Sequence, residues 1–370
     1  MSKSTKRAKL TLIVGAFSLV PALLLVFEMG TRMLRPHLDP LAVFVSSPQL
    51  KQDTQGKNTS GLFEFDPLLT WKLRGGLKNV WWDYTAVSTN QRGLRMAHEL
   101  GEKKPGAIRV VMLGDSVTFG YRIPIARDRE DASKVEPGKT YPALVEEELR
   151  GAYRGREIEI IPLACPGYTS GQGLAWLQRD IAELQPDIVT ACFGWNDIRS
   201  AGPPDRETAP RTSGQVLARK IISRSQGLLY TTADAAARNP GSLKAPEPRS
   251  SAEEYTAHFE QMAATCLNHG AWFGVILPVY RDPNTPDTEP LHQPQPEEGA
   301  RMTLYRDRLR EVVKAHHIPA LEIIELTEKN WPASKPLFGE RIHPNAAGHA
   351  LMAERVAAFI EPQVTQLFKK

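Results

Sequence analysis

Residues 108–117 read IRVVMLGDSV, a mostly apolar, β-branched run that ends in a glycine, an acid and a serine. The run from Ile108 to Leu113 is typical of a buried strand, and Gly114 indicates a turn directly after it. A serine at a tight turn between a strand and a helix projects its hydroxyl above the carboxyl edge of a sheet, where a nucleophile is needed. Gly-Asp-Ser is also common turn chemistry, so Ser116 alone does not establish catalysis.

The rest of the chain repeats this alternation of strand and helix. Four further short apolar runs are predicted as strands, at 157–163, 187–193, 272–279 and 320–326. Amphipathic patterns predict helices over 141–154, 174–184, 251–266, 299–316 and 345–359. Nearly continuous apolar strands that alternate with helices indicate an α/β fold of three layers, with a central parallel sheet of about five strands.

Three further connections carry candidate functional residues. Gly167 and Tyr168 follow the second predicted strand, Trp195 and Asn196 follow the third, and His343 precedes the last predicted helix. The loops after parallel strands meet at the carboxyl edge of the sheet, which is the usual position of a ligand. Tyr168 and Trp195 are therefore candidate pocket residues, with simple packing as the alternative.

The ordered combination of these motifs resembles the SGNH/GDSL hydrolases. It consists of Gly-Asp-Ser-Val at 114–117, a glycine at 167, Gly-x-Asn-Asp at 194–197 and an acid three residues before His-Pro-Asn at 343–345. The resemblance covers roughly residues 107–362 and implies a flavodoxin-like sheet. The preceding segment is similar to that of bacterial membrane-anchored members, which tend to carry the residues found here as Asp66, Pro67, Trp71, Thr89, Asn90, Gly93 and Arg95.

The resemblance implies a serine esterase mechanism. Ser116 would attack an ester carbonyl while His343 takes its proton. The backbone N–H groups of Ser116 and Gly167 and the side-chain amide of Asn196 would hold the oxyanion. The family usually has an aspartate where this chain has Glu340, so Glu340 is the candidate orienting acid. A backbone carbonyl or a water molecule remains the alternative partner of His343.

The N-terminus carries a candidate membrane anchor. Four cations within the first nine residues precede LTLIVGAFSLVPALLLVF, an uncharged run from Leu10 to Phe27. As a helix this run would be about 27 Å long, close to the thickness of about 30 Å of a hydrocarbon core. A cleaved signal peptide is the alternative, but no A-x-A-like site follows the run. We therefore expect a single-pass anchor with a cytoplasmic N-terminus and an extracytoplasmic catalytic domain, periplasmic or on the outer face of a bacterium.

The distribution of charge argues against a nucleic-acid partner. The formal charge of +4 equals the four N-terminal cations, so the rest of the chain sums to zero. A Pro-rich insertion at 199–250 stands out, with nine basic and four acidic residues between 199 and 249. A connection of this length is typical of a lid, a binding loop or a disordered segment. A solvated surface insertion without a function is the alternative. A cationic lid would favour an anionic polysaccharide or lipid as substrate.

These features divide the chain into a cytoplasmic tip with an anchor at 1–35, an irregular preface at 36–106 and a hydrolase domain at 107–362. The sequence predicts a membrane-anchored serine esterase that cleaves acetyl or short acyl esters on a cell-surface polysaccharide. A polysaccharide O-acetyltransferase, a lipase or lysophospholipase, and a catalytically silent glycan-binding protein remain open. No cofactor or metal is predicted, because no coordination set is complete. Protein partners and the oligomeric state remain unknown.

Overall fold

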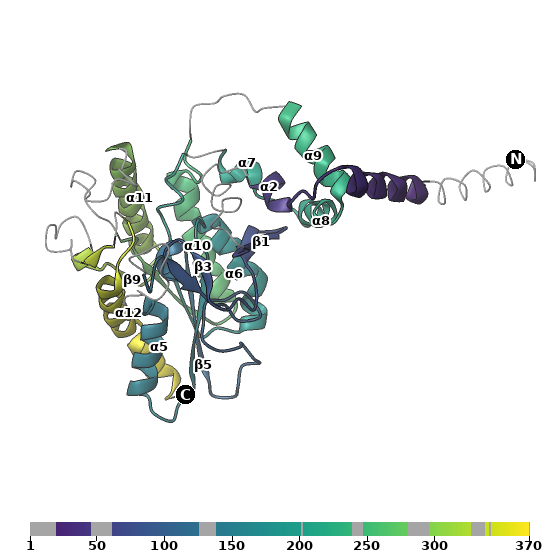
Figure 1. Cartoon of the computed structure of the whole chain (residues 1–370). Coiled ribbons are helices and arrows are strands. Elements are labelled where there is room, and N and C mark those ends of the chain that lie inside the picture. The colour runs from purple at the N-terminus through teal and green to yellow at the C-terminus, as the bar shows by residue number, and fades with distance from the viewer. Residues whose placement is uncertain are drawn as a thin grey trace, which may run out of the picture.

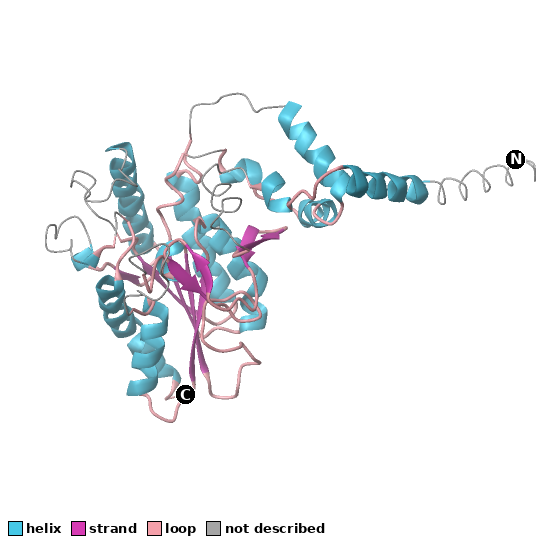
Figure 2. Cartoon of the chain, in the orientation of Figure 1, coloured by secondary structure: helices cyan, strands magenta, loops and turns pink. Residues whose placement is uncertain are grey.

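The computed structural model describes residues 20–45, 61–125, 138–200, 203–238, 247–279, 296–326, 337–339 and 342–369. At its centre lies a five-stranded parallel sheet in the order β6-β5-β7-β8-β9 (Figures 1 and 2). The strands are β5 (Ile108–Gly114), β6 (Ile158–Ala164), β7 (Ile188–Cys192), β8 (Trp272–Ile276) and β9 (Ala320–Leu321). Every residue of β5 and β7 is buried, which confirms the apolar α/β sheet predicted from the sequence.

Helices cover both faces of this sheet. One face carries α5 (Tyr141–Ala152) and α12 (Ala346–Leu367), and the other carries α6 (Ser170–Leu184), α10 (Ala252–Asn268) and α11 (Pro296–Ala315). Because side chains alternate along a strand, neighbouring residues of β5 supply both cores. Val110 and Met112 pack on the side of α5, whereas Val111 and Leu113 pack on the side of α6.

The order of the strands fixes where the site lies. In chain order the five strands are arranged 2-1-3-4-5, and the direction of winding reverses between β5 and β7. The connections that leave β5 and β7 therefore diverge at this switch point, which is where an open parallel sheet binds its ligands. The loops with Ser116 and Asn196 are those two connections.

The preface contains two antiparallel hairpins. They are formed by β1 (Phe63–Asp66) with β2 (Thr70–Leu73) and by β3 (Val80–Trp82) with β4 (Thr85–Val87). Trp71 Nε1 donates to the carbonyl of Pro166 over 3.1 Å, so the first hairpin is joined to the loop after β6. Arg95 donates to the carbonyls of Phe119 and Gly120, at the end of the turn that begins with Ser116. The preface thus supports two loops of the site.

The insertion contains α7 (Asp205–Thr208), α8 (Ser213–Ile222) and α9 (Gln226–Arg238). The sequence of the insertion predicts one helix, around 216–230, whereas the structure has two, α8 and α9, separated at 223–225. Figure 1 shows α8 and α9 beside the N-terminal helix, away from the sheet. These two helices therefore do not form the expected lid over the carboxyl edge. Two other elements also differ from expectation: β9 has only two residues before a 3₁₀ turn at Ile324–Leu326, and α12 continues to Leu367.

Residues 20–34 form the N-terminal helix, which projects from the body of the molecule (Figure 1). Residues 10–19 of the expected anchor lie outside the described residues. Among the helices that the structure describes, none is both long enough and apolar enough to cross a membrane. A short helix at the start of the preface, α2 (Pro40–Phe44), packs against α9.

Candidate active site

Ser116 begins α4 (Ser116–Phe119) directly after β5. The turn is tight: a Cβ on Gly114 would lie 1.9 Å from Thr118 Oγ1, so only glycine fits there. Asp115 caps the helix, since its Oδ1 accepts from the amide of Val117 over 2.9 Å. This strand-to-helix turn holds the Ser116 side chain at the carboxyl edge, in the position expected of a nucleophile.

His343 lies next to Ser116. Its Nε2 is 2.7 Å from Ser116 Oγ, so the hydroxyl can donate to the ring when this nitrogen is unprotonated. The following Pro344 is paired with Phe338 in an isolated bridge, which fixes the connection before α12. On its other side the imidazole contacts the ring of Tyr121, with a centroid distance of 4.3 Å. The His343 imidazole is therefore held between Ser116 and the ring of Tyr121.

Gly167 forms the turn after β6 and has a positive φ of 83°, which favours glycine. Its carbonyl oxygen accepts from Arg249 Nη1 over 2.6 Å. The same guanidinium binds Gln172 in α6 and Asp205 in the insertion, each over 2.9 Å. Arg249 therefore holds this turn through the carbonyl of Gly167.

Asn196 lies in the loop after β7 and is only 6% exposed. Its Nδ2 donates to the carbonyl of Tyr168 over 3.0 Å and lies 3.4 Å from Asp115 Oδ2. The first contact occupies one amide hydrogen, and the second is long for a hydrogen bond. The second hydrogen of this amide is thus the one that a ligand oxygen beside Ser116 can compete for.

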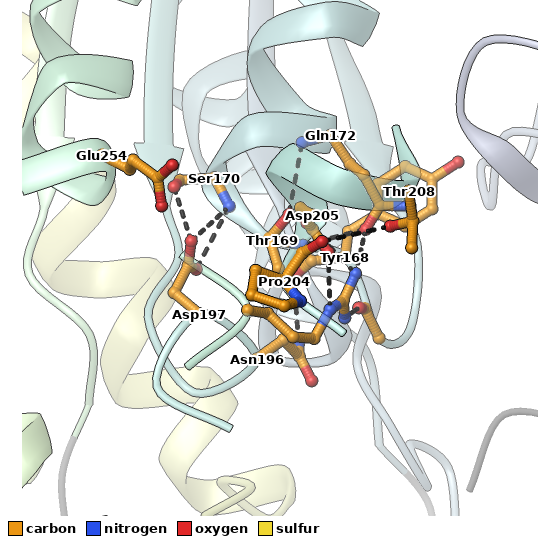
Figure 3. Close-up of polar contacts among 12 residues, drawn as sticks. Tyr168, Thr169, Ser170, Gln172, Asn196, Asp197, Pro204, Asp205, Thr208 and Glu254 are labelled. Carbon is orange, nitrogen blue, oxygen red and sulfur yellow. Dashed lines mark hydrogen bonds and ion pairs between the residues drawn. The ribbon is translucent and has the colours of Figure 1, made fainter. Parts of the chain in front are cut away.

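Asp197, the next residue in this loop, binds the start of α6. Figure 3 shows Asp197 beside Ser170 and Asn196 near Tyr168, so two consecutive residues of one loop hold the start of α6. The Asp197 carboxylate accepts from the amide of Ser170 over 3.0 Å and from its hydroxyl over 2.6 Å. Burial raises the pKa of Asp197 to about 7, although hydrogen bonds from Ser170 and Ser250 oppose the shift.

Asp115 is a second buried carboxyl at the site. Burial raises the pKa of Asp115 to about 6, against the hydrogen bond from Val117 and the charges of His343 and Arg199. It is therefore close to half protonated in the pH range in which an ordinary histidine titrates. Its described contacts, with Val117 and Asn196, are those of a turn-stabilising residue.

The structure brings together Ser116, Gly167, Asn196 and His343 from four separate connections. Glu340 lies outside the described residues, so its role as orienting acid stays a prediction. Among the described residues no group of three or more His, Cys, Asp or Glu side chains is arranged to hold a metal ion.

Tyr168 and Trp195, the two candidate pocket residues, are both buried. The Tyr168 hydroxyl donates to the carbonyl of Trp71, and Trp195 Nε1 donates to that of Val279 over 3.0 Å. Packing accounts for the contacts that these side chains make. Their contact with substrate stays a prediction.

Sequence reasoning missed Tyr121, Asp83 and Arg249. The Tyr121 hydroxyl donates to Asp83, which lies in the turn between β3 and β4 and also pairs with Arg122 at 3.1 Å. No sequence motif joins this preface turn to the site, because the contact depends on how the hairpin packs. The abundance of arginine in the insertion was visible, but the contact of Arg249 with Gly167 was not.

Comparison with known proteins identifies a family that covers the residues of the site. The model of the GDSL-like lipase/acylhydrolase family matches residues 112–351. An arylesterase of Vibrio mimicus is 30% identical over 96 residues, which cover 26% of this chain and 41% of the arylesterase. The chain thus matches less than half the length of this curated relative.

Several solved structures are similar at low sequence identity. A GDSL-like lipase from Bacteroides thetaiotaomicron is 17% identical, with a TM-score of 0.41 over 69% of this chain and 88% of the lipase. A lipase/acylhydrolase from Enterococcus faecalis is 17% identical, with a TM-score of 0.40 over 69% and 96% of the two chains. The acetylxylan esterase Axe2 from Geobacillus stearothermophilus is 18% identical, with a TM-score of 0.41 over 68% and 94%.

Proposed function

The chain belongs to the GDSL-like lipase/acylhydrolase family, a family of carboxylic-ester hydrolases, and on that premise we propose that it is a serine esterase that acts through an acyl-enzyme on Ser116. The observation that carries the proposal is the distance of 2.7 Å between Ser116 Oγ and His343 Nε2. A nucleophile and a base within hydrogen-bond reach are what acyl transfer requires.

In the proposed reaction Ser116 Oγ attacks the ester carbonyl while His343 Nε2 takes the hydroxyl proton. The tetrahedral oxyanion accepts from the amides of Ser116 and Gly167 and from Asn196 Nδ2. His343 then gives its proton to the departing alkoxide, which leaves as an alcohol. Water attacks the acyl-enzyme with the same base, releases the acid and restores Ser116.

We assign to Glu340 the task of orienting His343 and stabilising the imidazolium. A glutamate accepts from Nδ1–H as an aspartate does, with a longer reach. If Glu340 has this role, Glu340→Gln lowers kcat and leaves KM nearly unchanged. If a backbone carbonyl or water holds the ring instead, the substitution has little effect on either constant.

The preferred substrate is a short acyl ester of a polyhydroxylated alcohol, such as an acetylated polysaccharide. Support comes from the surroundings of His343. Its ring contacts Tyr121, whose hydroxyl binds Asp83. Asp83 pairs with Arg122, which lies over the ring of Tyr84. Aromatic rings beside charged groups suit a sugar, which presents both apolar faces and hydroxyls. A broad apolar groove would suit a long acyl chain better.

The test is an activity profile of the full chain in detergent on p-nitrophenyl esters of increasing length, with Ser116→Ala as the matched control. We expect the highest kcat/KM on the acetate and a steady fall with chain length. An increase with chain length would indicate a lipase instead. Repeating the acetate reaction with added oligosaccharide separates hydrolysis from transfer, because a transferase releases acetylated sugar in place of acetate.

The same proposal includes a membrane anchor at the N-terminus. It is supported by the uncharged run Leu10–Phe27, which follows four cations, and by the exposed apolar side chains of the described part of that run. Such surface is costly in water and stable in hydrocarbon. The hydrolase domain then lies on the extracytoplasmic side of the membrane. Flotation of the full chain with vesicles, resistant to high salt and carbonate, tests this part separately from catalysis.

A further inference from the structure

Exposed apolar surface on this molecule is concentrated at one end. Along the N-terminal helix the exposed large side chains are Val20, Leu23, Leu24, Leu25, Val26, Phe27, Met29, Met33 and Leu34. Met33 and Leu34, which follow the uncharged run, are 82% and 86% exposed. Apolar exposure therefore continues beyond the segment expected inside the hydrocarbon core.

The insertion contributes to the same end of the molecule through α8. Leu217 and Ile221, one turn apart, are 56% and 53% exposed. Arg219 of the same helix points into the preface, where it donates to the carbonyl of Pro67 and to Thr70 Oγ1. At about 100° per residue, Leu217 and Ile221 lie about 200° around the helix from Arg219. Their side chains thus face away from the body of the protein.

A defined contact joins the insertion to the N-terminal helix. The Glu28 carboxylate accepts from the amides of Gln226 and Gly227, both over 3.0 Å, and from Ser225 Oγ over 2.6 Å. It therefore caps α9 from outside, at the positive end of the helix dipole. Burial opposes ionisation of Glu28, but these bonds and that of Arg32 outweigh it and lower its pKa to about 2.

Further contacts along α9 make this junction stiff. The amide of Leu38 donates to Gln226 Oε1 and Gln226 Nε2 donates back to the Leu38 carbonyl. The Tyr230 hydroxyl donates to the carbonyl of Pro36. A Cβ on Gly227 would lie 2.4 Å from the Phe27 ring, so the two helices are in close contact there. These contacts join α9 both to the N-terminal helix and to the residues that follow it.

The segment that contains α8 carries charge of only one sign. Between residues 209 and 233 the chain has no Asp or Glu and four cations, Arg211, Arg219, Lys220 and Arg224. Lys220 is exposed on α8, which also carries Leu217 and Ile221, and Arg224 is exposed just after the end of this helix. Figure 1 shows α8 end-on and crosswise to the N-terminal helix. An amphipathic basic helix that runs crosswise to the proposed anchor helix has the arrangement of one that lies in the membrane surface.

From these observations we infer that α8 is a second membrane contact, which rests in the headgroup region of an anionic phospholipid bilayer. Leu217 and Ile221 enter the interface, and Lys220 and Arg224 bind lipid phosphates. The inference rests on the proposed anchor and adds to it, because an anchor alone would let the hydrolase domain swing. Two contacts joined through Glu28 hold the active site at one height and orientation above the membrane.

The test places a single environment-sensitive dye on α8 of the full chain in vesicles of phosphatidylcholine and phosphatidylglycerol. Leu217→Cys carries the reporter, and Leu267→Cys is the matched control, since Leu267 is 78% exposed at the far end of α10. The native cysteines, Cys165, Cys192 and Cys266, are buried and do not compete for a polar dye. Lipids with a spin label near the headgroup serve as quenchers.

We expect a blue shift and quenching at position 217 and neither at position 267. The substitutions Lys220→Gln and Arg224→Gln together should reduce the quenching at 217, as should vesicles of phosphatidylcholine alone. A reporter at 217 that stays in water while the protein floats with the vesicles would overturn the α8 contact and leave the anchor intact. Failure to float at all would overturn both. Hydrolysis of p-nitrophenyl acetate by the labelled proteins reports separately on the proposed esterase.

Discussion

Arg249 Nη1 lies 2.6 Å from the carbonyl oxygen of Gly167, so a residue near the end of the insertion holds the turn that supplies an oxyanion donor in the proposed reaction. The amide of Arg249 donates to the carbonyl of Arg199 over 2.9 Å, which closes the insertion at its base. The two ends of the insertion therefore meet beside the oxyanion turn.

The first prediction concerns this clamp. Arg249→Met keeps the length of the side chain and removes its five donors, so the Gly167 turn loses its support. A small displacement of an oxyanion donor is enough to lower kcat about 10- to 100-fold, with little change in KM. Steady-state kinetics on p-nitrophenyl acetate measures both constants.

Arg206→Met is the control for the clamp. Arg206 is also in the insertion, but its ion pairs with Glu247 and Glu254 are far more exposed. It should retain wild-type kinetics. Equal kcat values for Arg249→Met and Arg206→Met would show that the clamp does not position Gly167.

Asn196→Ala tests the side-chain donor. Removing one oxyanion donor typically costs about 10²- to 10³-fold in kcat. The fold should persist, because the lost bond to Tyr168 is one hydrogen bond of about 1 kcal/mol. Stopped-flow kinetics and thermal unfolding of the same sample separate the two effects. A variant that unfolds at the wild-type temperature and keeps full kcat would exclude Asn196 from the oxyanion hole.

Arg95 links the preface to the nucleophile turn, and its loss should be costly. The guanidinium is half-buried and donates to the carbonyls of Phe119, Gly120 and Ile123. Arg95→Ala leaves those carbonyls without a donor and should lower the free energy of unfolding by about 3 kcal/mol or more. Urea denaturation measures this, and a loss below about 1 kcal/mol would contradict the structural role.

Asp197 should make stability depend on pH. Its pKa is raised from 3.8 to about 7, so the folded state binds this proton more tightly than the unfolded state does. The contribution of Asp197 is therefore complete below about pH 4 and is lost as the pH rises to about 7, at about 1.4 kcal/mol per pH unit in the steepest part.

Asp197→Asn removes this titration. The free energy of unfolding of the variant, relative to the wild type, should therefore increase from pH 4 to pH 7. Denaturant titrations of both proteins at each pH measure the difference. A constant difference over this range would mean that the carboxyl titrates normally in the folded state.

The sequence anticipated the parts of the site that depend on local chemistry. Gly167 needs a positive φ, Ser116 needs a strand-to-helix turn, and the Asn cap at 345 marks the start of α12; each is visible in a few adjacent residues. The parallel sheet followed from apolar runs such as 108–113, because burial on both faces removes polar alternation.

What the sequence left out depends on contacts between distant segments. Three residues, Ser-Arg-Ser at 223–225, separate α8 from α9. The start of α9 is stabilised by Glu28, which lies about two hundred residues earlier in the chain. The contact of Tyr121 with Asp83 likewise depends on how the preface packs against the hydrolase domain.

The central claim is that Ser116 is the nucleophile, and covalent labelling tests it most directly. The full chain is treated with a fluorophosphonate, digested, and the adduct located by mass spectrometry. We expect one adduct, on Ser116, absent from Ser116→Ala, together with a loss of ester hydrolysis of about 10³-fold or more in that variant. An adduct on another serine, such as Ser170 at 2.8 Å from His258 Nδ1, or undiminished hydrolysis by Ser116→Ala, would contradict the account.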